Sequence, residues 1–191
     1  YKIDQNYRYF YYDYDSLDDG EDFERLRELV ENIYTNEYLD KLLQKWNSGI
    51  LEENAFGKQP LQIDFYDSNI GGLKDRTVVI ISDALRYEVG HELYATLADD
   101  PKSNIRIDTS LSVLPSYTRL GMAALLPHKS ITMSDDYTVL VDGMSCDNLL
   151  TRQNILQRNC DNGICVQFDD IKNMKKSELR DIFTGKQLVY V

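Results

Sequence analysis

The sequence has 191 residues and a formal net charge of −11, from 21 lysines and arginines against 32 aspartates and glutamates. With 42% hydrophobic residues, 10 glycines and 4 prolines, it has the composition of a globular protein, which excludes a disordered or fibrous chain. No apolar run approaches the roughly 18 residues of a membrane span, so we expect no membrane partner, and the acidity argues against a broad basic surface for nucleic acid.

The beginning of the chain is predicted to be helical. Apolar and aromatic residues recur at the spacing of one helix face over residues 3–17, 23–33 and 38–46. Thr35 or Asn36 is the expected cap of the third helix, because both side chains accept hydrogen bonds from free backbone N–H groups.

A connector with little regular structure is predicted over residues 48–75, which contain several glycines and a proline. We therefore expect a helical region with its connector at 1–75 and a second domain at 76–191. The first part carries 8 basic and 17 acidic side chains, and the second carries 13 and 15. The net charge therefore says little about a phosphate site in the second part.

From residue 77 the pattern changes to alternating strands and helices. Such alternation predicts an α/β fold, with a mostly parallel sheet, right-handed crossovers and helices on both faces. The continuous β-branched run at 77–82 is typical of a strand buried on both faces. The expected strands lie at 77–82, within 105–114, and at 137–141, 164–168 and 187–191, and the expected helices lie over 85–97, 119–126, 147–157 and near 177–183.

The last expected strand, at 187–191, has no crossover, loop or cap after it. Domains seldom end in the middle of a buried strand. We therefore expect the sequence to be a fragment of a longer protein, with only the N-terminal part of the α/β domain present.

Asp83 directly follows the first apolar run. Ligands of open parallel sheets bind beyond the carboxyl ends of the strands, and a carboxylate there is a rigidly placed oxygen ligand for a divalent cation. The alternative is that Asp83 caps a helix that starts at Ala84.

A second polar position follows Leu114 and Pro115, where a strand is expected to end and a helix to begin. Ser116 and Thr118 lie at this helix entrance, where free N–H groups favour a phosphate and ease deprotonation of an alcohol. Either residue is alternatively a plain N-cap. An aspartate and a hydroxyl at neighbouring strand ends together match a metal-activated nucleophile.

The segments at 78–88 and 114–127 resemble the PglZ domain of the bacterial BREX phage-defence phosphatases, a branch of the alkaline phosphatase superfamily. The resemblance covers residues 76–191, and the helical region resembles the segment that precedes this domain. It implies that Asp83 is a metal-ligating aspartate and Thr118 the nucleophile, with Ser116 as the fallback nucleophile. Arg119 is a candidate phosphate contact, or alternatively a solvent-facing helix arginine.

The resemblance also implies a cofactor of two zinc ions in the full-length protein, held by further Asp and His ligands beyond residue 191. Neither His91 nor His128 falls where the family has a ligand, and we expect His91 to be exposed. Glu88 either approaches the metal region or pairs with a nearby base. We therefore expect this fragment to bind no metal pair tightly and to hydrolyse little or nothing.

Cysteine spacing points to no metal site. Three residues, Cys146, Cys160 and Cys165, form an odd number that matches no zinc framework, which predicts reduced, partly buried thiols and, by default, a cytoplasmic location.

Other phosphate-handling classes lack their motifs. No Gly-x-x-x-x-Gly-Lys-Ser/Thr or Gly-x-Gly-x-x-Gly sequence occurs, and a haloacid-dehalogenase nucleophile would require an aspartate at the position of Leu85.

Two function hypotheses follow. The first is a metal-dependent phosphatase or phosphodiesterase that acts on a phosphate ester of unknown identity, nucleic acid among the candidates. The second is a non-catalytic scaffold or docking module of the defence complex. Expected partners are other BREX proteins, such as the methyltransferase.

Overall fold

The computed structural model describes residues 1–52 and 56–191. The chain divides into two compact units, Tyr1–Lys58 with Leu85–Asp108, and Gln59–Ala84 with Thr109–Val191. The helix that follows Asp83 thus belongs to the first unit, whereas the predicted division after residue 75 would place it in the second domain. That division stays a prediction. No helix in the described part of the chain is long and apolar enough to cross a membrane.

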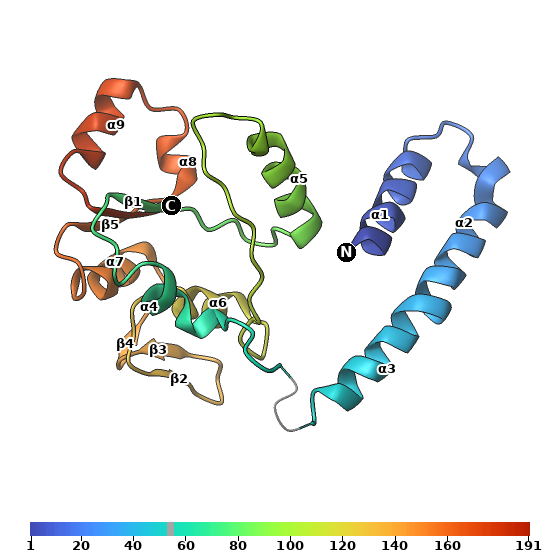
Figure 1. The fold of residues 1–191 in the computed structure, drawn as a ribbon, viewed down its shortest axis with the longest axis horizontal. Coiled ribbons are helices and arrows are strands. Elements are labelled where there is room, and N and C mark those ends of the chain that lie inside the picture. Colours follow the sequence, from blue (N-terminus) through green and yellow to red (C-terminus); the bar gives the residue numbers. More distant parts are fainter. Residues whose placement is uncertain (53–55) are drawn as a thin grey trace. The chain divides into compact units, whose positions relative to one another are not determined.

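The first unit is helical, as expected. Its elements are α1 (Lys2–Asp15), the 3₁₀ turn η1 (Gly20–Phe23), α2 (Glu24–Asn32), the π-helical segment η2 (Ile33–Leu39), α3 (Asp40–Gly49) and α5 (Tyr87–Ala98). The four α-helices are labelled in Figure 1. The expected cap at Thr35 or Asn36 is wrong, because both residues lie inside η2, which joins α2 to α3 without a break. The π turn keeps the backbone hydrogen-bonded, so no helix N-terminus exists there to be capped.

Polar and aromatic contacts join α1 to α5 within the first unit. Arg8 forms an ion pair with Glu88, whose side chain is buried, so the second of the two expectations for Glu88 is confirmed. Glu92 accepts a hydrogen bond from Gln5 Nε2 at 2.6 Å. His91 is half-buried rather than exposed, because its ring stacks on that of Tyr1 at a centroid distance of 5.3 Å.

The second unit contains two sheets. Its helical elements are η3 (Gln62–Asp64), α4 (Phe65–Asn69), α6 (Thr118–Ala124), α7 (Leu149–Gln157), α8 (Phe168–Ile171) and α9 (Lys176–Phe183). Its strands are β1 (Thr77–Val79), β2 (Ile131–Met133), β3 (Val139–Val141), β4 (Met144–Ser145), β5 (Gly163–Cys165) and β6 (Leu188–Tyr190).

The first sheet is parallel, with the strand order β1-β6-β5. In its register Leu188 lies between Thr77 and Gly163, and Tyr190 lies between Val79 and Cys165. All three residues of β6 are buried, as a central strand covered on both faces requires. The predicted α/β fold with a parallel sheet is therefore confirmed.

The second sheet, β2-β3-β4, is antiparallel and was only partly predicted. The strand expected at 137–141 exists as β3, but its partners β2 and β4 were not expected. Asp142 and Gly143 form the turn between β3 and β4, with φ of 48° and 80°, as a tight hairpin with an Asp-Gly turn requires.

Two expectations about irregular segments are wrong. The strand expected within 105–114 is absent from the described residues except for one bridge between Leu111 and Leu61. Leu111 exchanges backbone hydrogen bonds with Pro60 and Gln62 instead of with a neighbouring strand. In the connector expected at 48–75, residues 53–55 lie outside the described residues, and the described part is more ordered than expected because it contains η3 and α4.

The core of the second unit lies between α6, α7 and the two sheets. Its most deeply buried side chains include Ala123, Val139, Val141 and Leu156. The hydroxyl of Tyr190 donates to the Leu125 carbonyl at 2.9 Å, which ties β6 to the end of α6. The parallel sheet and α6 are thereby held as one rigid support for the side chains beyond the strand ends.

Candidate active site

A cavity of about 310 Å³ lies at the carboxyl ends of the three parallel strands. Its polar lining comes from Asp83, Thr118, Arg152 and Gln167, and its remaining walls are mostly apolar, with Phe168 among them. The cavity occupies the place where open parallel sheets bind ligands. It brings together Asp83 and Thr118, which lie 35 positions apart in the sequence.

Asp83 lies in an exposed turn after β1. Its Oδ1 accepts a hydrogen bond from the Ala84 N–H at 2.9 Å, and Ala84 has a positive φ of 57°. Helix α5 begins at Tyr87 with Arg86 at the N-cap, so Asp83 does not cap a helix that starts at Ala84. That alternative is wrong, and the carboxylate is directed instead by a local turn at the cavity.

Thr118 is the first residue of α6, and its side chain is exposed at the cavity. The N-cap position belongs to Tyr117, and no side-chain capping hydrogen bond occurs at this helix start among the described residues. The alternative that Ser116 or Thr118 is a plain N-cap is therefore wrong. Ser116 precedes the helix in an exposed turn and is not one of the described residues that line the cavity.

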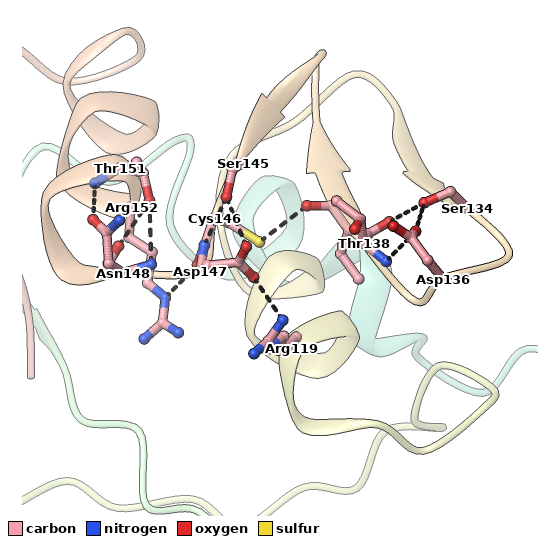
Figure 2. Close-up of polar contacts among 11 residues, drawn as sticks. Arg119, Ser134, Asp136, Thr138, Ser145, Cys146, Asp147, Asn148, Thr151 and Arg152 are labelled. Atoms are coloured by element: carbon pink, nitrogen blue, oxygen red, sulfur yellow. Dashed lines mark hydrogen bonds and ion pairs between the residues drawn. The ribbon is translucent and has the colours of Figure 1, made fainter.

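The side chain of Arg119 contacts Asp147, which is not one of the described residues that line the cavity. Its Nη1 lies 3.4 Å from Asp147 Oδ1, and Asp147 Oδ2 accepts a hydrogen bond from Ser145 Oγ at 3.0 Å (Figure 2). Arg119 is not part of the cavity lining within the described residues, and about half of its side chain is exposed. Its phosphate role stays a prediction, whereas its contacts are those of a surface ion pair.

Arg152 and Gln167 are cavity residues that sequence reasoning missed. Arg152 lies on α7, and its Nε donates to the carbonyl of Cys146 at 2.8 Å (Figure 2). Gln167 lies two residues after the end of β5, at the N-cap of α8, and this position near a strand end is the signal that would have found it. Nothing in the helical pattern distinguishes Arg152 from other helix arginines.

The thiol at the cavity is poorly suited to be a nucleophile. Burial raises the pKa of Cys165 to about 11, and the positive charge of Arg152 offsets only part of that rise. Burial likewise raises the pKa of Cys146. All three cysteines are free thiols and two are buried, which confirms the expected reduced, partly buried state.

The described residues do not form a complete zinc site. No group of three or more His, Cys, Asp or Glu side chains in residues 1–52 and 56–191 is arranged to hold a metal ion. A catalytic zinc takes three protein ligands, and the cavity offers the single carboxylate of Asp83. His128 is not in this cavity, and its Nδ1 lies 2.7 Å from the Leu126 carbonyl.

Comparison with known proteins identifies the family. Residues 68–191 match the family model described as the BREX system PglZ alkaline phosphatase-like domain. The chain belongs to this family. It is 40% identical to the alkaline phosphatase-like protein PglZ of Bacillus cereus (strain H3081.97) over 99% of its length, and 34% identical to the alkaline phosphatase-like protein BrxZ of Escherichia coli O9:H4 (strain HS) over 87%.

The matches cover only part of each relative. The chain spans 23% of the first protein and 20% of the second, or about a fifth of the curated relatives that it matches. No solved structure matches the chain. Membership in the PglZ family thus supports a BREX component with an alkaline-phosphatase-like domain, of which the cavity at the strand ends is a part.

Proposed function

We propose that this chain is part of a phosphatase or phosphodiesterase of a bacterial BREX defence system, and that Thr118 is its nucleophile. The observation that carries the proposal is that Asp83 and Thr118, which come from different elements, line one cavity at the carboxyl ends of the parallel strands of a PglZ-family domain. The carboxylate of Asp83 or the hydroxyl of Thr118 by itself would give weak support for a phosphatase, because either group is common at the surface of a protein.

The reaction would proceed in two displacements. Thr118 Oγ1 attacks the phosphorus of the ester and gives up its proton to water. The bond from phosphorus to the ester oxygen breaks, and that oxygen takes up a proton and leaves as the alcohol. Water then attacks the phosphothreonine and releases phosphate while Thr118 regains its proton. An activated hydroxyl that forms such a covalent intermediate replaces one difficult step by two easier ones.

Asp83 would be one ligand of a metal centre, for which we propose zinc. A divalent cation at this place would supply positive charge to the phosphoryl oxygens and favour the alkoxide form of a nearby alcohol. Because residues 1–52 and 56–191 provide no complete set of ligands, the other ligands would have to come from further residues of a longer protein. The present chain by itself would then hydrolyse little.

The test uses the complete natural protein that carries this sequence, with an aryl phosphate ester as substrate. Thr118→Ala should lower turnover about 10³-fold or more, because the attacking atom is removed, while the melting temperature stays unchanged. The control is Ser116→Ala, whose hydroxyl lies outside the cavity lining and whose loss should leave turnover within about twofold. If Ser116→Ala abolishes turnover and Thr118→Ala does not, Ser116 is the nucleophile.

Metal content separates this function from a scaffold. We expect elemental analysis of the complete protein to find zinc, and Asp83→Asn to reduce it. A complete protein that contains no metal and shows the same phosphate release with and without Thr118 would instead support a docking module for other BREX proteins, the methyltransferase among them.

A further inference from the structure

The side chain of Arg152 is anchored at the cavity by a hydrogen bond to the backbone. The carbonyl that accepts its Nε hydrogen bond belongs to Cys146, which is 1% exposed and therefore fixed in the core. The start of α7 is fixed as well, because Asn148 Oδ1 accepts a hydrogen bond from the Thr151 N–H at 3.0 Å in a capping box. The guanidinium therefore has little freedom to move away.

The positive charge of Arg152 has no counter-ion within the described part of the chain. No carboxylate there lies within ion-pair distance of it. The nearby Asp147 instead contacts Arg119 and Ser145. In Figure 2 the two terminal nitrogens of Arg152 point away from the Cys146 carbonyl, and they make no hydrogen bond to another described residue.

A half-buried guanidinium without an anion is unfavourable, because burial removes water that the protein does not replace. An anionic ligand in the cavity would supply the missing partner. The charge acts on its surroundings, since it lowers the pKa of both Cys146 and Cys165 against the larger effect of burial.

We propose that Arg152 binds the phosphoryl group of the substrate, with its two terminal nitrogens donating to two oxygens of that group. The planar fork of a guanidinium matches a pair of phosphate oxygens, which a lysine ammonium does not. The proposal assigns to Arg152 the phosphate contact that the sequence suggested for Arg119. It rests on the proposed function for the identity of the anion, but not on Thr118 as the nucleophile.

The experiment measures binding without turnover. Inorganic phosphate is titrated by calorimetry into the complete natural protein that carries Thr118→Ala, alone or combined with Arg152→Met, Arg152→Lys, Arg119→Met or Arg158→Met. We expect Arg152→Met to weaken phosphate binding about 10-fold to 100-fold, the range of a lost hydrogen-bonded charge, and Arg152→Lys to weaken it less. Arg158 ends the same helix and lines a different cavity, so Arg158→Met is the matched control and should leave the Kd within about twofold.

The outcomes separate the two proposals. An unchanged Kd in both Arg152 variants overturns the inference, as does a large loss in Arg119→Met alone or a parent protein that binds no phosphate at millimolar concentration. Where Arg152→Met fails to fold, the folded Arg152→Lys variant decides. If Thr118→Ala retains full turnover while Arg152→Met still weakens phosphate binding, the assignment of Thr118 as the nucleophile fails and the assignment of Arg152 as the phosphate contact holds.

Discussion

The two units differ in how much each one buries in its own interior. Among the described residues of α1, α2, η2 and α3 no side chain is buried, and α5 buries only Glu88. The second unit instead encloses a core of aliphatic residues around Leu156 and β6. Because a rigid core can fix side chains in place, the second unit is the part of the chain suited to hold a catalytic cavity.

The largest contrast is expected from removal of a core side chain. Leu156→Ala removes a fully buried side chain from the second unit and should cost about 3 kcal/mol, through lost burial and the cavity that remains. Leu29 on α2 is 54% exposed, and Leu29→Ala should change stability by no more than about 0.5 kcal/mol. Native-state hydrogen exchange of the complete protein measures both. Equal costs would contradict the contrast between the units.

A smaller effect is expected where α7 packs on β5. A Cβ added at Gly163 would lie 3.0 Å from both the Cys160 carbonyl oxygen and Leu156 Cγ, so Gly163→Ala has to shift the helix or the strand. We expect a cost of about 1–3 kcal/mol in a thermal melt. Gly72→Ala is the control, since a Cβ there meets nothing within 4 Å. A neutral Gly163→Ala would show that this contact is looser than the structure has it.

The Asp142 turn provides a pH test in the second unit. Burial alone would raise the pKa of its carboxyl, but hydrogen bonds from the Ser130 and Lys129 N–H groups hold the pKa below its usual range. Stability from a depressed pKa is present above the unfolded value of about 3.9 and is lost as the pH falls through the folded value. The protection factors of amides near Ser130, which are exchange rates corrected for the intrinsic effect of pH, should therefore fall in acid, and Asp142→Ala should remove this pH dependence.

The smallest effect is expected in the first unit, at an exposed pair on α2. Hydrogen bonds from Arg27, and then Tyr14, lower the pKa of Glu24 to about 2. The contribution of Glu24 is present above pH about 4.5 and is lost as the pH falls toward 2. Because the pair is exposed, we expect Glu24→Gln to speed amide exchange in α2 only slightly, and less at high salt. A large, salt-independent effect would mean that this unit depends on the pair more than its exposure implies.

The sequence predicted the elements with a strong apolar pattern. The runs that became β5 and β6 are apolar because the parallel sheet buries most of their residues, and their spacing from α7 and α9 indicated crossovers. The expected burial of 77–82 on both faces is wrong, because β1 lies at the end of the strand order and Val78 is 54% exposed. The strands β2 and β4 were missed because they lack a continuous apolar run: two of the three residues of β2 are exposed, and neither residue of β4 is fully buried. The segment at 105–114 has an alternating pattern but no partner strand, and pairing is a tertiary property that the pattern does not contain.

The candidate site was predicted in part for a similar reason. Asp83 was found because it follows the apolar run that contains β1, and Thr118 because a helix entrance was expected there after a proline. Both line the cavity, although the strand expected before Thr118 is absent from the described residues. Arg152 was missed because its role depends on two tertiary facts, the Cys146 carbonyl that holds its Nε and the absence of a carboxylate beside it in the described residues. Arg119 was preferred only because it is adjacent to Thr118 in the sequence.

The position of β6 has a consequence for how the second unit is made. This strand comes last in the sequence, yet it lies between β1 and β5, which do not pair with each other. During synthesis, the ribosome has to deliver residues 188–190 before any rung of the parallel ladder can form. Until then β1 and β5 are unpaired edges of the kind that associate with other chains. A ribosome that stalls before Leu188 would therefore leave an aggregation-prone nascent chain in which the parallel sheet cannot form.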